Sequence, residues 1–156
     1  MIIMEAEQRT RIVHNEVRME FDSLSENEAF ARNAVASFVM RLDPTMEELS
    51  DIKTAVSEAV TNAILHGYEG RMDGKIQMNC KIDRDVLRVE IKDKGKGIPD
   101  IKQAMEPLFT TRPELERSGM GFAFMEAFMD DLEVLSEVGE GTTVIMLKKL
   151  GVSPWI

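Results

Sequence analysis

Apolar residues alternate with charged ones over positions 17–21, and this two-residue period predicts a β-strand. Apolar residues then recur at helical spacing over 30–42, which predicts a first helix. Ser25 and Glu28 have the S-x-x-E pattern of a capping box at the start of that helix. Pro44 bounds its end, because the residue before a proline disfavours helical geometry.

A second amphipathic helix is expected between Thr45 and Gly67. Thr45 and Glu48 repeat the capping-box pattern, and apolar residues follow at intervals of three and four. Gly67 is well placed as a C-cap, because glycine readily adopts the left-handed conformation that ends many helices. His66 beside it is expected to satisfy the helix C-terminus rather than to act as a catalytic base.

Two strands and a long irregular segment come next. Residues 76–82 and 87–91 alternate apolar with polar residues and predict a pair of strands. Residues 93–121 contain two glycine clusters and several prolines, with a short possible helix over 101–105. A loop of this length inside a compact domain is usually functional, and often a lid.

The chain closes with a third helix from about Gly121 and a hairpin formed by 132–137 and 142–149. The sequence GEGTT between the last two strands is most simply a hairpin turn. This order of elements predicts an α+β fold, a two-layer α/β sandwich whose mixed, mainly antiparallel sheet has helices on one face.

Composition and charge exclude several classes of protein. The 156 residues suffice for one domain, expected at 13–149 between a flexible extension (1–12) and a C-terminal tail (150–156). A net charge of −9 argues against direct nucleic-acid binding, which needs clustered Lys and Arg. The single cysteine, Cys80, excludes an internal disulfide and is expected to be inert. No segment is apolar enough for a membrane span or a secretory signal, so a cytoplasmic protein is expected.

Glu58 and Asn62 are the first candidates for chemistry. In a helix they project within roughly 40° of each other and away from the apolar stripe. One interpretation is a solvated polar face, which needs no function. The other is a general base beside a ligand for a metal ion or a phosphate.

Asp93, Gly95 and Gly97 form the pattern D-x-G-x-G directly after a predicted strand. Glycines at these positions let the backbone approach a ligand closely, and the aspartate can accept a hydrogen bond from an exocyclic amino group such as that of adenine. The alternative is an ordinary glycine-rich turn. Ser118 begins a second cluster, SGMG, where a helix N-terminus would favour phosphate oxygens, although an ordinary loop has the same composition.

The order of these features resembles the GHKL (Bergerat) ATP-binding superfamily over nearly all of 13–149. Within it, LDPTMEELSDIKTAVSEAVTNAILHGY (42–68) and EPLFTTRPELERSGMGFAFMEAFMDD (106–131) are similar to the anti-sigma F factors, a family of sporulation serine kinases. The resemblance implies a protein-serine kinase that uses ATP and Mg²⁺.

The resemblance also implies a role for individual residues. Glu58 would be the general base, Asn62 would bind Mg²⁺ through its amide oxygen, and Asp93 would receive the adenine amino group. The remaining contacts to ATP or ADP would come from Gly95, Gly97, Ile98, Thr110, Thr111, Ser118, Gly119, Met120, Gly121 and Thr142.

Protein partners are implied in the same way. The chain would inhibit a sigma factor of the sigma F type, phosphorylate an anti-anti-sigma protein on a serine, and form a homodimer. Arg32 matches a position that contacts partners in the family, and Glu116 in the lid is a second candidate. The sequence alone favours a solvated helix residue as the interpretation of Arg32. Three alternatives stay open: a general-stress kinase of the sigma B type, a nucleotide-gated sigma-binding module without kinase activity, and a histidine-kinase ATP domain. The last is disfavoured, because no dimerising helix with a phosphoacceptor histidine precedes the fold.

Overall fold

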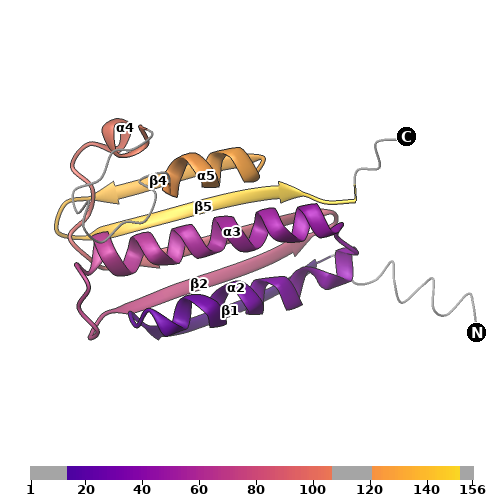
Figure 1. Ribbon diagram of the computed structural model, residues 1–156, viewed down its shortest axis with the longest axis horizontal. Helices are drawn as coiled ribbons and strands as arrows, with labels where there is room; N and C mark the ends of the chain where they lie inside the picture. Colours follow the sequence, from indigo (N-terminus) through magenta and orange to yellow (C-terminus); the bar gives the residue numbers. More distant parts are fainter. Residues whose placement is uncertain (1–13, 107–120, 152–156) are drawn as a thin grey trace, which may run out of the picture.

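A computed structural model describes residues 14–106 and 121–151 of the chain. Its centre is a five-stranded sheet in the order β1-β2-β3-β5-β4 (Figure 1). Each strand pair in these residues is antiparallel, so the expectation of a mixed sheet was wrong in that detail. The strands are β1 (His14–Asp22), β2 (Lys75–Asp83), β3 (Val86–Asp93), β4 (Asp131–Glu137) and β5 (Gly141–Lys149).

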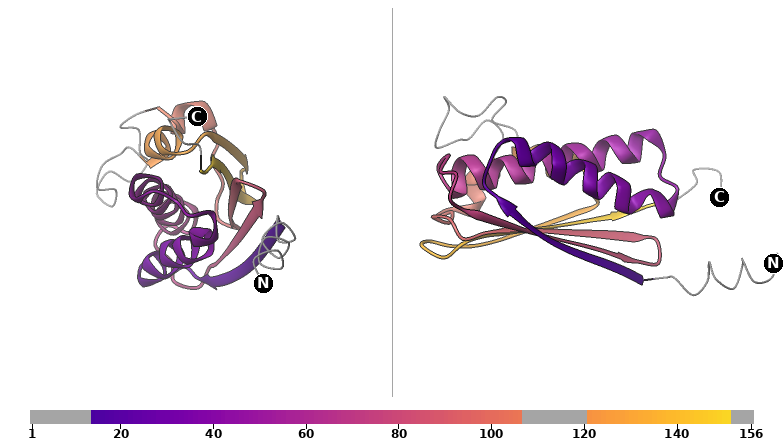
Figure 2. Two further views of the ribbon diagram at one scale, coloured as in Figure 1. Left: turned by 90° about the vertical axis from the view of Figure 1, so that its right-hand side faces the viewer. Right: turned by 90° about the horizontal axis from the view of Figure 1, so that it is seen from below.

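The long helices lie on one face of this sheet, which confirms the predicted two-layer α+β architecture (Figure 2). The helical segments are α2 (Glu26–Val39), η1 (Met40–Leu42), α3 (Met46–Asn62), η2 (Ala63–Gly67), α4 (Ile101–Ala104) and α5 (Gly121–Phe128). In this part of the chain, no helix has the length and apolarity needed to cross a bilayer.

The core forms where α2, α3 and α5 cover the inward-facing side chains of the strands. Its largest fully buried side chains include Ile52 on α3, Met78 on β2 and Met146 on β5. Burial of each such side chain contributes about 1.5–3 kcal/mol. Cys80 is also fully buried, and burial raises the pKa of its thiol to about 12, as an inert cysteine requires.

The predicted capping box at the start of α3 is confirmed. The Glu48 backbone N–H donates to Thr45 Oγ1 at 3.1 Å, and the Thr45 N–H donates to the Glu48 carboxylate at 2.9 Å. These reciprocal bonds satisfy backbone donors that the helix itself leaves unpaired. They fix the start of the helix that carries Glu58 and Asn62.

The capping box predicted for α2 does not form. Ser25 already has helical backbone angles, and its side chain makes no capping bond. The Glu28 carboxylate is engaged elsewhere, since it accepts bonds from Arg32 at 3.1 Å and from the hydroxyl of Ser57 on α3. Glu28 therefore links α2 to α3 instead of closing its own first turn.

Helix α3 ends near Gly67 as predicted, but not through a left-handed glycine at that residue. The chain continues from Asn62 into one π-helical turn, η2. Positive φ angles occur two and three residues after Gly67, at Glu69 (55°) and Gly70 (78°). The Gly70 N–H closes this end by donating to the Ile64 carbonyl at 2.9 Å.

Candidate functional site

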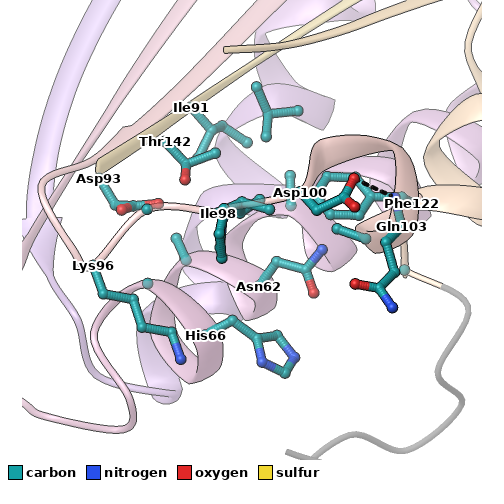
Figure 3. A pocket seen from close by; sticks show the side chains of 18 of the residues that line it. Asn62, His66, Ile91, Asp93, Lys96, Ile98, Asp100, Gln103, Phe122 and Thr142 are labelled. Atoms are coloured by element: carbon teal, nitrogen blue, oxygen red, sulfur yellow. Dashed lines mark hydrogen bonds between the residues drawn. The ribbon is translucent and has the colours of Figure 1, made fainter. Parts of the chain in front are cut away.

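A cavity of about 360 Å³ lies where the C-terminal end of α3 meets the end of β3 and the start of β5 (Figure 3). Apolar residues from α5, β3 and β5 form much of its wall, among them Phe122, Ile91 and Val144. A few polar side chains on an apolar wall are typical of a small-molecule site. The predicted nucleotide contacts that line the cavity are Asn62, Asp93, Gly97, Ile98, Gly121 and Thr142.

Asp93 is the buried carboxylate of this cavity, and Thr142 is a second buried polar residue in its wall. Asp93 ends β3, and 5% of its surface is exposed. Its carboxylate accepts the backbone N–H of Gly95 at 2.9 Å and the backbone N–H of Thr142. Burial raises the pKa of this carboxyl, and the two hydrogen bonds oppose the rise. Asp93 is thus a rigidly held acceptor beside Thr142 (Figure 3).

Two glycines allow the helix end and the strand end to meet around Asp93. A Cβ atom on Gly67 would lie 2.9 Å from the Asp93 carboxylate, and one on Gly95 would lie 2.0 Å from the Gly67 carbonyl oxygen. No residue with a side chain fits at either position without movement of the backbone. Gly95 does not line the cavity but supports its wall from behind.

A close backbone contact and a hydrogen bond hold the segment after Asp93 against the β4–β5 hairpin. Gly97 has a φ of 78°, and a Cβ there would lie 2.3 Å from the carbonyl oxygen of Glu137. The Ser136 hydroxyl accepts the Ile98 N–H at 2.7 Å and lies 2.8 Å from Thr142 Oγ1. GEGTT forms the turn and the first residues of β5 in this hairpin, as predicted, and Ser136 at the end of β4 holds Ile98 and Thr142 in the cavity wall.

A second polar group of the site lies where α3 meets the start of α5. A Cβ on Gly121 would lie 3.1 Å from Asn62 Nδ2 and Oδ1, and 3.3 Å from Glu58 Oε2. The helical spacing of Glu58 and Asn62 thus brings both side chains to the first residue of α5. The exposed backbone N–H groups of a helix N-terminus, a carboxylate and an amide meet at this point.

The predicted lid and partner-contact residues fall into two groups. Thr110, Thr111, Glu116, Ser118, Gly119 and Met120 fall outside the described residues. Arg32 does not line the cavity; it pairs with Glu28 at 3.1 Å, and 37% of its side chain is exposed.

Other lining residues were missed by sequence reasoning. Three of them, Lys96, Pro99 and Asp100, belong to the segment DKGKGIPD. The D-x-G-x-G pattern within this segment predicts roles only for Asp93 and the two glycines. His66 was assigned only to the helix end, although it lies one turn after Asn62 and also lines the cavity (Figure 3). Gln103 and Phe122 carried no sequence signal of their own.

Comparisons with known proteins agree with this geometry. The family described as "Histidine kinase-like ATPase domain" matches residues 21–148. Among solved structures, the chain resembles the RsbU and RsbW domains of a Mycobacterium tuberculosis protein, with a TM-score of 0.62, 18% identity, and 87% of this chain and 32% of that chain covered. It also resembles the catalytic domain of the histidine kinase ThkA, with a TM-score of 0.52, 17% identity, and coverage of 86% and 97%. These two likenesses show a shared fold.

Curated relatives are much more similar in sequence. An anti-sigma F factor of Clostridium beijerinckii is 61% identical over 138 residues, which cover 88% of this chain and 96% of that protein. An anti-sigma F factor of Bacillus velezensis is 55% identical over 139 residues, which cover 89% and 95%. With this identity over nearly the whole length of its relatives, the chain belongs to the anti-sigma F factor family and carries a histidine-kinase-like ATPase domain.

Proposed function

We propose that this protein binds and inhibits a sigma factor of the sigma F type and is also an ATP-dependent protein-serine kinase. Its substrate would be an anti-anti-sigma protein that competes with the sigma factor. The observation that carries the kinase proposal is the cavity, with buried Asp93 in its wall and Glu58 beside Asn62 where α5 begins. The names of the curated relatives support the anti-sigma role.

We expect the nucleotide to lie in the cavity in one direction. The Asp93 carboxylate would accept the adenine amino group, with Gly97, Ile98 and Thr142 around the base. The phosphates would then extend toward Asn62 and the N-terminus of α5. Unpaired backbone N–H groups and the positive end of the helix dipole favour anionic oxygens there.

Asn62 fits a role in holding Mg²⁺. Its amide oxygen is the kind of hard ligand that Mg²⁺ prefers, and it lies beside the expected phosphate position. The described residues contain no group of three His, Cys, Asp or Glu side chains able to hold a metal ion. Most ligands would therefore come from the triphosphate and water, as is usual for Mg²⁺. When bound, the ion would neutralise charge that develops on the phosphates.

Glu58 would accept the proton of the incoming serine hydroxyl. The serine oxygen then forms a bond to the γ-phosphorus, the bond from that phosphorus to the β–γ bridging oxygen breaks, and ADP leaves. Catalysis of this transfer consists mainly of positioning and charge stabilisation. Glu58, Asn62 and Gly121 would contribute to positioning, because they come from two helices that pack against each other.

Further partner contacts complete the proposal. Arg32 and Glu116 would contact protein partners, and Thr110, Thr111, Ser118, Gly119 and Met120 would contribute to the nucleotide lid. The protein would act as a homodimer.

The first test is phosphorylation of the antagonist. The purified protein is incubated with Mg-ATP and a candidate anti-anti-sigma protein, and intact mass is measured. We expect a single added phosphate on a serine, and its loss in both Glu58→Gln and Asn62→Ala. Nucleotide affinity separates the two variants: Glu58→Gln keeps ATP binding, whereas Asn62→Ala loses the Mg²⁺-dependent part of it.

Two results would contradict the proposal. Phosphorylation at the normal rate by Glu58→Gln would remove Glu58 as the base. ATP binding and sigma inhibition without any phosphorylated product would instead support a nucleotide-gated sigma-binding module. Inhibition of a general-stress sigma factor in place of the sigma F type would correct the choice of partner.

A further inference from the structure

A second hollow, of about 510 Å³, lies beside the cavity proposed above to bind the nucleotide, which we call the nucleotide cavity. Its lining residues come from three loops that meet at one end of the sheet: Gly67, Glu69, Arg71, Lys94, Gly95, Lys96 and Gly139. Gly67 and Lys96 also line the nucleotide cavity, so the two spaces share a wall. We call this second space the basic hollow, because three cations and a single carboxylate line it.

The basic hollow gathers three cations in a chain with a net charge of −9. Of the lysine and arginine side chains in the described residues, seven are held in ion pairs, Lys81 and Arg88 among them, and eight form none. Arg71, Lys94 and Lys96 form no ion pair with any described residue. Their charge is therefore available to an acidic ligand.

The backbone around the basic hollow argues against a small phosphate ligand. Phosphate sites are commonly built from backbone N–H groups aimed at the anion. Here the N–H of Lys94 donates to the Tyr68 hydroxyl at 2.8 Å, and that of Lys96 to the Gly67 carbonyl at 3.0 Å. The N–H of Gly139 donates to the Lys96 carbonyl at 2.8 Å. The groups that remain to meet a ligand are the exposed side chains of Lys94 and Lys96 and the terminal nitrogens of Arg71, whose Nε donates to the Tyr68 carbonyl at 3.2 Å.

Apolar side chains next to the basic hollow indicate a protein ligand. Met72 follows Arg71 and is 70% exposed, and Val138 precedes Gly139 and is 64% exposed. Val138 also lines the nucleotide cavity, so it lies at the boundary of the two spaces. Exposed apolar side chains with cations around them are compatible with the apolar centre and polar rim of a protein–protein interface.

We propose that the basic hollow, with Met72 and Val138, docks an acidic segment of the protein that carries the acceptor serine. This inference rests on the proposed kinase function. The serine must reach Glu58, which lies nine residues before Gly67 and hence roughly 13 Å away along the helix. Because Gly67 and Lys96 line both spaces, a protein that presents its serine to the nucleotide cavity would also extend over the hollow. Electrostatic attraction then accelerates its association and sets its orientation.

The experiment measures steady-state phosphorylation of the anti-anti-sigma protein by the full-length kinase. Lys94→Glu is compared with Arg41→Glu, which makes the same charge change at an exposed residue of η1, at the opposite end of α3. Neither residue lines the nucleotide cavity. We expect Lys94→Glu to raise the KM for the protein substrate about three- to tenfold, with the KM for ATP unchanged. The increase should shrink as salt is added, whereas Arg41→Glu should match the wild type.

The outcomes separate this inference from the function on which it rests. Normal phosphorylation with equal KM values for wild type, Lys94→Glu and Arg41→Glu would overturn docking at the basic hollow and leave the kinase proposal intact. An absence of phosphorylation by the wild type would overturn both. The double variant Arg71→Glu/Lys94→Glu provides a second check, since its KM should exceed that of Lys94→Glu.

Discussion

A Cβ atom on Gly67 would lie 2.9 Å from both Cγ and Oδ1 of Asp93. The end of the helix that carries Asn62 and the end of the strand that carries Asp93 therefore approach until no side chain fits between them. This contact fixes the distance between the two polar groups of the nucleotide cavity. Gly95 in turn lies against the carbonyl of Gly67, where an added Cβ would be 2.0 Å from the oxygen.

Gly67→Ala should weaken nucleotide binding strongly. The new methyl group must displace either the Asp93 carboxylate or the helix end, because atoms at 2.9 Å overlap. We expect the Kd for ATP to rise at least tenfold, measured by calorimetric titration. Gly70→Ala is the matched control: it has a φ of 78° but no atom within 4 Å of the added Cβ. It should cost about 1–2 kcal/mol of stability and leave ATP affinity unchanged. Equal affinities in both variants would contradict the steric argument.

Asp93 should give the nucleotide-free protein a specific pH dependence. Burial raises the pKa of this carboxyl above its ordinary value of 3.8, so the folded state retains the proton to a higher pH than the unfolded state. The stability associated with Asp93 is therefore greatest at low pH. It falls as the pH rises from about 3.8 to the raised pKa, and is constant above that.

Asp93→Asn isolates this effect, because an amide does not titrate. Urea unfolding of both proteins at a series of pH values gives the difference in their free energies of unfolding. The wild type should lose stability relative to Asp93→Asn as the pH rises through that window. A relative gain would mean that the hydrogen bonds from Gly95 and Thr142 outweigh burial.

The elements of this fold were largely predictable because local signals determine them. The capping box of Thr45 and Glu48 begins α3, and a helical period then places Glu58 and Asn62 on one face. Both signals act within a few residues, so a sequence displays them directly. The same type of signal failed at Ser25, because Glu28 has a partner on another helix, Ser57, which no local pattern shows.

The supporting residues of the site could not be predicted for the same reason. Ser136 bonds to Ile98 across a sequence separation of 38 residues. The sequence predicts Gly67 as a helix end. The structure shows a different need for glycine there, because a side chain would overlap the carboxylate of Asp93. Such contacts depend on the order of strands in the sheet, which places β5 between β3 and β4. The hydrophobic pattern of a single sequence does not show the order of strands in the sheet.

Ser136→Ala should loosen the wall of the cavity formed by Ile98 and Thr142. The substitution leaves the Ile98 N–H without its acceptor at 2.7 Å and removes the hydroxyl 2.8 Å from Thr142 Oγ1. An unsatisfied donor of this kind costs about 1–3 kcal/mol, which urea unfolding can measure. ATP affinity should also fall by about tenfold or less, since the base contacts are held less firmly. Ser50→Ala, at an exposed position of α3, is the control; it should leave ATP affinity unchanged and should not destabilise the protein.

Lys148→Met should disturb the placement of α5. The Lys148 ammonium donates to the carbonyl of Phe128, the last residue of α5, at 2.6 Å and pairs with Asp51 of α3 at 3.6 Å; its side chain is 12% exposed. Loss of this charged hydrogen bond should destabilise the protein by about 1–3 kcal/mol in urea unfolding. Because α5 begins at Gly121, beside the expected phosphate position, the Kd for ATP should rise more than the Kd for adenosine. The control Asp51→Asn keeps the bond to Phe128 and should cost about 1 kcal/mol or less. If Lys148→Met weakened the binding of ATP and of adenosine equally, Lys148 would stabilise the fold without positioning α5.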